Sequence, residues 1–182
     1  MKKLLSLVAI AGILFNQSLS AQEESIANKV FYTEIGGAGV IMSANFDSRF
    51  KSNERLGFGY RIGVGFGYGE FEDRIEYPDM VVISKSYNKT YYSIPAGLNY
   101  VFGKPNDRNT FEVGAGVTFL TRKTTVYPFE RGEAGNAIGH LSFMYRIMPL
   151  NGGFSFRIGF TPIIGTGGDL FPSGTVGFGY VF

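Results

Sequence analysis

The sequence predicts an all-β fold, an eight-stranded antiparallel up-and-down transmembrane β-barrel. Three observations support this prediction. Apolar residues alternate with small or polar ones at a period of two along most of the chain, glycine is frequent (26 of 182 residues), and aromatic residues make up 16% of the sequence. Such a composition disfavours helices, and period-two alternation is typical of strands that have two different faces.

The first 21 residues form a separate segment. Lys2 and Lys3 precede an apolar run from Leu4 to Phe15, and small residues follow up to Ala21. This pattern is typical of a cleaved secretory signal peptide. We therefore divide the chain into a signal peptide at 1–21 and an outer-membrane β-barrel domain at 22–182.

The residue inventory excludes several classes of function. Removal of the two lysines in the signal peptide leaves 15 basic residues against 15 acidic ones, so the charge gives no argument for nucleic-acid binding. The absence of cysteine rules out disulfides and thiol catalysis. With a single histidine besides, we expect no metal site and no cofactor.

Seven strands follow from the alternation, joined by short polar turns around 47–56, 103–109 and 149–153 and by longer polar connections at 70–90, 122–137 and 166–173. Alternating short and long connections are typical of a meander whose two ends face different compartments. The predicted strands are 40–46, 57–69, 91–102, 110–121, 138–148, 153–165 and 174–182.

An eighth strand is needed because an exported chain should keep both termini at the same end of the barrel. In the first candidate, 29–36, Glu34 faces inward and Phe31 and Ile35 face outward. These outward residues occupy odd positions, whereas from Val40 onward the outward residues occupy even positions. A tight turn or bulge is therefore expected at 36–39. The second candidate is 79–86, whose outer positions are less apolar. We favour 29–36.

The segment GFGYRIGVGFGYG (57–69) fixes the two faces of the barrel. Its even positions are all bulky and apolar or aromatic, and its odd positions are glycines except for Arg61. A solvated face would carry Lys, Glu, Thr and Gln, so the bulky face is expected to meet lipid. The glycines are expected to hollow the inner wall for side chains that reach across the barrel.

Five charged residues fall on the predicted inner face. We expect them to form a structural network of ion pairs that plugs the lumen, with Glu34 or Glu112 as the partner of Arg61. The alternative is a narrow polar passage through the barrel. The five residues are Glu34, Arg61, Glu112, Arg146 and Arg157.

His140 and Ser142 share one face of a predicted strand, as a base and a nucleophile would. No glutamate follows them in the chain to orient the histidine as the third member of a catalytic triad. The predicted face is also the lumen, whereas a lipid substrate would meet the outer surface. We therefore expect a buried polar contact and no catalytic residues.

The last strand ends in alternating apolar and aromatic residues, Val176, Phe178, Tyr180 and Phe182. This pattern resembles the C-terminal insertion signature of outer-membrane β-barrel proteins. With the segments IPAGLNYVFGK, EVGAGVTFL and GGFSFRIGFTP, the chain resembles the transmembrane barrel of outer membrane protein A and its relatives, of the type found in Bacteroidota. The resemblance implies export through the inner membrane and residence in the Gram-negative outer membrane. It also implies contact with outer-membrane lipid and lipopolysaccharide, assistance from the barrel-assembly machinery, and a monomer.

The long connections place aromatic residues beside charges, a composition that suits a binding surface. The expected function is therefore a structural or surface-interaction role in the cell envelope, without enzymatic activity. A porin-like narrow channel for small solutes is the alternative, and modification of lipid A is less favoured. The sequence names no ligand, adhesion partner or solute.

Overall fold

The computed structural model describes residues 26–77, 80–124, 135–165 and 167–182. The predicted signal peptide, 1–21, lies outside the described residues. Within the described part of the chain, no helix has the length and apolar character to cross a membrane.

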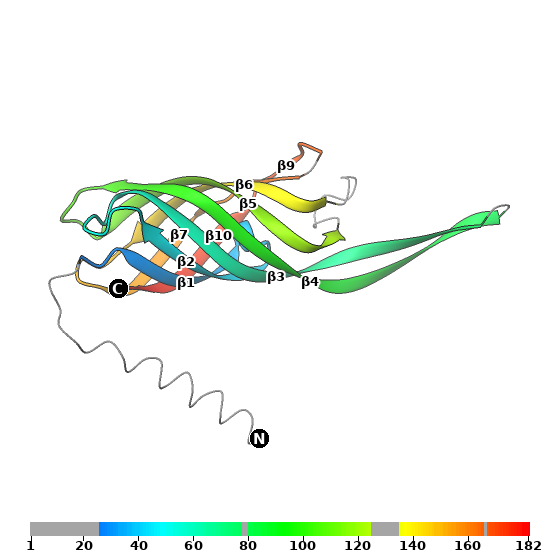
Figure 1. Cartoon of the computed structure of the whole chain (residues 1–182), viewed down its shortest axis with the longest axis horizontal. Helices are drawn as coiled ribbons and strands as arrows, with labels where there is room; N and C mark the ends of the chain where they lie inside the picture. Colours follow the sequence, from blue (N-terminus) through cyan, green and yellow to red (C-terminus); the bar gives the residue numbers. More distant parts are fainter. Residues whose placement is uncertain (1–25, 78–79, 125–134, 166) are drawn as a thin grey trace, which may run out of the picture.

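The strands form one antiparallel sheet that closes on itself (Figure 1). Closure is made by β1 pairing with β10 and by β5 pairing with β6. The two short strands β8 and β9 pair with each other, and β8 continues the line of β7 along β6. The elements are β1 (Lys29–Gly36), the 3₁₀ turn η2 (Gly37–Gly39), β2 (Met42–Arg49), β3 (Gly57–Tyr77), β4 (Met80–Gly103), β5 (Asn109–Thr124), β6 (Gly135–Ile147), β7 (Gly153–Phe160), β8 (Ile163–Ile164), β9 (Leu170–Phe171) and β10 (Gly174–Val181).

The eight barrel strands β1 to β7 and β10 confirm the predicted fold class. The eighth strand is 29–36, which forms β1 and pairs with both β2 and β10. The rival segment 79–86 is no separate barrel strand, because from Met80 onward it belongs to β4 and pairs with the far half of β3.

Several strand boundaries differ from the prediction, and two of the differences have a local cause. The strand expected at 40–46 begins at Met42, because Val40 belongs to the turn and has a φ of 78°. The strand expected at 153–165 is interrupted at Thr161 and Pro162, since a proline has no N–H to donate to the ladder. The carbonyl of Pro162 still accepts from the N–H of Leu141 at 3.0 Å, which keeps β8 in line.

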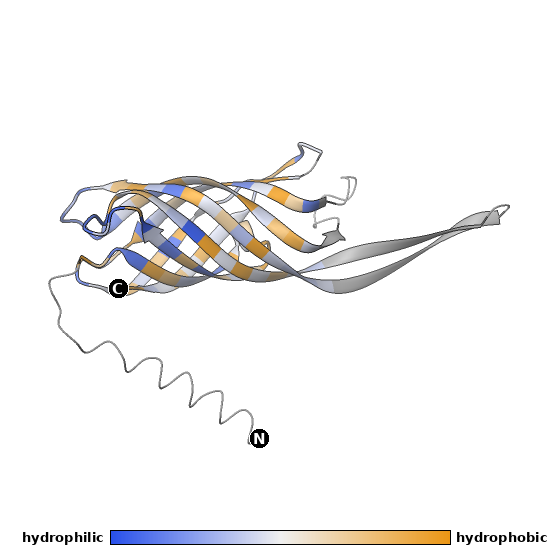
Figure 2. Cartoon of the chain, viewed as in Figure 1, coloured by the Kyte–Doolittle hydropathy of each residue, from blue (hydrophilic) through white to orange (hydrophobic). Residues whose placement is uncertain are grey.

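The barrel has an apolar exterior and a polar interior. Outward residues along β3 are exposed, from Phe58 (66%) through Val64 (65%) to Tyr68 (58%), and the inward Arg61 between them is only 4% exposed. The other barrel strands repeat this alternation, and Figure 2 shows the hydrophobic positions recurring along them. A soluble barrel has the reverse arrangement, so this exterior is the lipid-facing wall of a transmembrane barrel.

The two ends of the barrel are different. The C-terminus, the start of β1 and the short turns lie at one end, here called the terminal end, and the β3–β4 hairpin extends from the other, the hairpin end (Figure 1). The start of β1 is joined to the C-terminus by a hydrogen bond from the Lys29 N–H to the Phe182 carbonyl at 3.1 Å.

Aromatic rings form a belt outside the terminal end. Phe58 contacts Tyr100 with ring centroids 4.8 Å apart, and the belt continues from Tyr100 through Phe102 and Phe111 to Tyr145. This series covers β3, β4, β5 and β6. Such belts are typical of the level where a membrane meets water.

A buried arginine ties the turns of the terminal end together. Arg55 donates to the carbonyl oxygens of Met148 at 2.7 Å and Pro105 at 3.0 Å, and so connects three turns. In one of these turns Asp107 accepts from the backbone N–H of Asn109 at 3.0 Å, which lowers the pKa of the Asp107 carboxyl.

Candidate functional site in the barrel lumen

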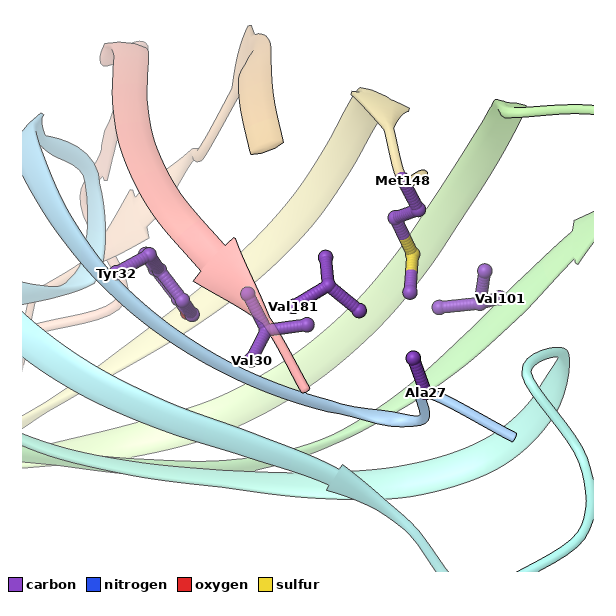
Figure 3. Close-up of a cluster of buried hydrophobic side chains, with 6 residues drawn as sticks. All are labelled: Ala27, Val30, Tyr32, Val101, Met148 and Val181. Atoms are coloured by element: carbon purple, nitrogen blue, oxygen red, sulfur yellow. The ribbon is translucent and has the colours of Figure 1, made fainter. Parts of the chain in front are cut away.

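Inward side chains of the lumen form a polar layer between two apolar ones. The terminal layer consists of Ala27, Val30, Tyr32, Val101, Met148 and Val181 (Figure 3). The hairpin layer consists of Tyr91, Leu120, Ile138 and Ile163. Along β6 the order from the hairpin end is Ile138, His140, Ser142, Met144, Arg146, so the polar groups lie inside the barrel wall between the layers.

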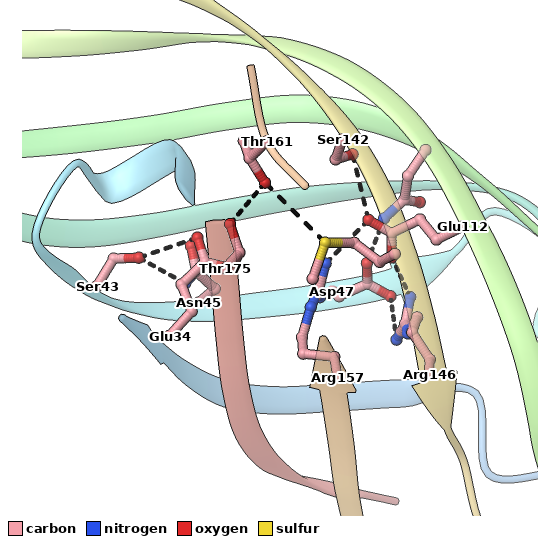
Figure 4. A network of polar contacts seen from close by, with 12 residues as sticks. Glu34, Ser43, Asn45, Asp47, Glu112, Ser142, Arg146, Arg157, Thr161 and Thr175 are labelled. Carbon is pink, nitrogen blue, oxygen red and sulfur yellow. Dashed lines mark hydrogen bonds and ion pairs between the residues drawn. The ribbon is translucent and has the colours of Figure 1, made fainter. Parts of the chain in front are cut away.

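The centre of the polar layer is an ion-pair network around Glu112 (Figure 4). One carboxylate oxygen of Glu112 accepts from Arg146 at 2.5 Å, and the other accepts from Arg157 at 2.9 Å. Arg146 also lies 3.5 Å from the carboxylate of Asp47, which pairs with Arg49 at 2.5 Å. Four strands therefore contribute to one continuous network, β2, β5, β6 and β7.

Asn99 on β4 completes the network on the side of β2. Its amide nitrogen donates to Asp47, and its amide oxygen accepts from Arg49 at 2.7 Å. All of these groups are buried. Each of the two carboxylates is thus shared by more than one donor, which is the arrangement that low-dielectric surroundings require.

Three of the five predicted network residues meet in this cluster, and two do not. Glu112, Arg146 and Arg157 are joined directly. Glu34 is buried in the lumen but accepts a hydrogen bond from Ser43 at 3.3 Å and pairs with no cation among the described residues. The expected pairing of Arg61 with Glu34 or Glu112 does not form within 4.0 Å.

Asp47 and Arg49 belong to the network although they lie within the polar turn that the sequence predicts at 47–56. The structure places both on β2, 0% and 3% exposed. Extending the period of two from Ser43 and Asn45 would have placed them inward. Their charge makes them resemble turn residues, and their pairing with β3, together with that of Asp47 with Val30 of β1, shows that the strand continues.

His140 and Ser142 are both buried in the lumen and are held by different groups. Nδ1 of His140 lies 3.2 Å from the hydroxyl of Thr118, which donates its own hydrogen to the Ala38 carbonyl at 2.7 Å. The ring N–H therefore donates to Thr118. Ser142 donates to Glu112 at 3.4 Å. No hydrogen bond joins His140 to Ser142 among the described contacts.

The turn between β1 and β2 folds into the hairpin end of the lumen. Gly37, Ala38 and Gly39 are buried, and the Gly39 carbonyl accepts from Ser93 at 3.1 Å. Val40, predicted to face lipid, packs instead against the hairpin layer. The tight turn expected at 36–39 thus also fills the barrel.

The inward glycines make room for large side chains on the neighbouring strand, and not for chains from across the barrel as predicted. A Cβ at Gly59 would lie 2.4 Å from the guanidinium carbon of Arg49, its partner in register. A Cβ at Gly67 would lie 2.3 Å from the ring of Tyr91. The same pairing joins Gly116 to His140, Gly159 to Met144, Gly177 to Arg157 and Gly179 to Tyr32.

The four residues of the C-terminal signature lie on or beside β10 and face away from the lumen. Phe178, Tyr180 and Phe182 are 47%, 59% and 52% exposed, and Val176 is partly exposed. Phe178 contacts Phe154 and Phe156 of β7 on the outer surface. The signature therefore forms part of the lipid-facing wall at the closing strand.

No protein-family model matches the chain, and no curated protein matches it. Among solved structures, the chain is similar to Ail, the attachment invasion locus protein of Yersinia pestis, solved in complex with the heparin analogue sucrose octasulfate. The TM-score is 0.30, with 15% sequence identity over 86% of this chain and 95% of that chain. The barrel described above, with its own strand pairing and its apolar exterior, has the fold of the small outer-membrane barrels that the sequence resembles.

Proposed function

We propose that this protein is a closed outer-membrane barrel that acts at the cell surface through the β3–β4 hairpin, without enzymatic activity. The observation that carries the proposal is the length of this hairpin. The last pair between β2 and β3 is Met42 with Phe66, but β3 and β4 stay paired as far as Tyr77 with Met80. Residues 70–77 alone add roughly 26 Å at ~3.3 Å per residue.

The form of the hairpin supports an interaction role. Beyond the barrel it is a ribbon of two strands (Figure 1), and among the described residues neither strand has a second neighbour there. The backbone groups on its two outer edges can therefore pair with an extended segment of another molecule. An isolated ribbon of this kind is marginally stable in water, and here its base is held by the barrel.

The orientation follows from the two ends of the barrel. An exported chain that inserts from the periplasm keeps its termini there, so the hairpin end faces outward from the cell. The lipid-facing wall and the aromatic signature at the C-terminus support residence in the outer membrane. The hairpin is then the part of the chain that extends furthest from the membrane.

Deletion of the distal hairpin tests the proposal. Replacing residues 72–86 by Asn-Gly should leave the barrel folded, because Phe71 and Tyr87 are partners in register and the pairs from Gly57 to Gly69 remain. Cells expressing this variant should lose adhesion to one another and to surfaces coated with collagen or albumin, relative to cells expressing the full chain. Equal adhesion by a correctly folded variant, or no adhesion by the full chain, would contradict the interaction role.

A narrow channel is the second candidate, and it is favoured only by the polar character of the lumen. Against it stand the apolar layers at both ends of the polar one and the η2 turn that fills the hairpin end. Purified protein in a planar bilayer should therefore give no steady single-channel current. Steady single-channel currents would contradict the closed barrel and support the channel.

An enzyme acting on lipid A is not supported by the site. The hydroxyl of Ser142 is directed to Glu112 and the ring of His140 to Thr118, both inside the barrel and away from lipid. The lipid A of cells with and without the protein should have the same mass. Loss of an acyl chain that depends on Ser142 would overturn this part of the proposal.

A further inference from the structure

The buried charges of the polar layer do not balance. Among the described residues, the lumen between the two apolar layers holds four arginines and three carboxylates, each no more than 4% exposed. One positive charge is in excess in a compartment with apolar material on all sides, where an uncompensated charge is strongly disfavoured. The groups are Arg49, Arg61, Arg146 and Arg157 against Glu34, Asp47 and Glu112.

The excess charge is that of Arg61, the register partner of Asp47 on the neighbouring strand. Asp47 and Glu112 are occupied by Arg49, Arg146 and Arg157, while Arg61 has no ion pair in the described structure. The Nη2 atom of Arg61 is fully enclosed and has no hydrogen-bond partner there. A buried guanidinium nitrogen without an acceptor indicates that a group is needed beside it.

Other enclosed polar atoms without partners belong to neighbouring residues. They are Nη1 and Nε of Arg157, the hydroxyl of Tyr32, Oε2 of Glu34 and Oδ1 of Asn45. The Arg157 guanidinium lies 4.2 Å above the Tyr32 ring. Glu34 and Arg157 are the two partners of Gly177 in register, on either side of a residue without a side chain.

Arg61 reaches the same region from β3. It interacts electrostatically with the Tyr32 hydroxyl, with the carboxylates of Glu34 and Glu112 and, more weakly, with the Arg157 guanidinium. Donors from β1, β3 and β7 therefore converge on one place in the lumen. Two acceptors without a partner also lie there, Oε2 of Glu34 and Oδ1 of Asn45, which is the register partner of Tyr32, and neither is hydrogen-bonded to these donors in the described structure.

We propose that this place binds one small monovalent inorganic anion of the size of chloride. The guanidinium groups of Arg61 and Arg157 and the hydroxyl of Tyr32 donate to it, and its charge cancels the excess of the layer. A water molecule between the anion and Glu34 donates one hydrogen to each, so that the carboxylate and the anion do not meet directly. This site does not depend on the surface role proposed for the hairpin.

A cluster of water alone is the competing occupant. Water would satisfy the unpaired donors, but it would leave the excess charge uncancelled in the interior of the barrel. If an anion occupies the site, the ratio of folded to unfolded protein rises with the concentration of that anion in solution. If water occupies the site, this ratio does not depend on which anion is present.

The test uses the whole barrel refolded in sodium bromide or in sodium gluconate at equal ionic strength. Bromide is the probe, because it is close to chloride in size and gives an anomalous X-ray signal, and gluconate is too large for the site. We expect one anomalous peak between Arg61 and Arg157, and a higher urea midpoint in bromide. At a bromide concentration of about 100 times the dissociation constant, the ratio of folded to unfolded protein rises about a hundredfold.

Two variants separate the site from a general salt effect. Arg61→Met should abolish the difference between bromide and gluconate. Arg55→Met, which removes a buried arginine from the turns of the terminal end, should retain it. Equal midpoints in the two salts, or a difference that persists in Arg61→Met, would overturn the proposal. If Arg61→Met fails to fold, the anomalous map of the unaltered protein decides, and the absence of a peak in the lumen leaves water as the occupant.

Discussion

Glu112 is the residue on which the lumen network depends most. It accepts from Arg146 with one oxygen and from Arg157 with the other, and it receives the weaker bond from Ser142. Asp47 is the only second acceptor near Arg146 in the described structure, at 3.5 Å. Loss of the Glu112 charge therefore leaves two buried cations with fewer acceptors than donors.

Glu112→Gln should lower the free energy of unfolding by ~3–5 kcal/mol, because the substitution keeps the shape of the side chain but removes the charge that the two arginines share. Urea unfolding in detergent micelles, followed by the shift in gel mobility, measures the effect. Glu54→Gln is the matched control, since Glu54 pairs with Lys51 in water and should change stability by about 1 kcal/mol or less. Equal effects of the two substitutions would show that the network contributes no more than a surface pair.

The inward direction of Glu112, Arg146 and Arg157 could be predicted from the sequence, because it depends only on the parity of the position within a strand. Their contacts could not be predicted. Which inward groups meet depends on the stagger between strands, and Glu112 meets Arg157 although its own partner in register is Met144. The same reason explains why Glu34 and Arg61 were expected to pair and do not.

At the scale of the strand, the barrel wall is built from pairs of one glycine and one large inward side chain. Gly116 pairs with His140 in register, and a Cβ there would lie 2.3 Å from the Ala96 carbonyl oxygen and 2.6 Å from the His140 ring. The large side chain is therefore in close contact with the glycine at each such pair. The backbone oxygen cannot move away without breaking hydrogen bonds between the strands.

Gly116→Ala should destabilise the barrel by ~1–3 kcal/mol, since the added methyl group overlaps a backbone atom as well as the His140 ring. Gly174→Ala is the control, because a Cβ at that position has no neighbour within 4 Å and the backbone there is extended. Urea midpoints of both variants provide the measurement. An unchanged midpoint for Gly116→Ala would contradict the close approach of β4 and β6 to this residue.

Val64→Arg should cost ~2–4 kcal/mol, because Val64 is 65% exposed in the middle of the outward series of β3, where the wall meets the lipid core. Phe58→Arg, at the aromatic belt, should cost about 1 kcal/mol or less. Unfolding from lipid vesicles measures both. Equal tolerance at the two positions would mean that the outward face of β3 does not cross a bilayer.

The prediction of strand length succeeded inside the barrel and failed outside it. Within the membrane each strand must place apolar groups on one side, so 57–69 could be identified from its alternation. Beyond Gly69 no lipid imposes that pattern, and the polar residues 70–90 resemble a loop although β3 and β4 stay paired. The charged end of β2 was missed for a related reason, because a turn and a lumen-facing strand end share the same polar residues.

At the scale of the whole molecule, the apolar exterior and polar interior make folding dependent on a membrane or a detergent. The purified protein should therefore migrate differently in a gel before and after boiling in detergent, as a closed hydrogen-bonded barrel resists detergent until it is heated. Identical mobility in the two lanes would argue that the barrel does not close in solution.

The pairing of β1 with β10 has a kinetic consequence. Val30 meets Val181 across about 150 residues of chain, whereas the other strands of the barrel join neighbours along the sequence. Bringing the two ends together costs about 4 kcal/mol of chain entropy before any of these hydrogen bonds forms. We therefore expect the pairing of β1 with β10 to be the slow step of assembly, and a cellular factor that holds the last strand in place would accelerate this step most.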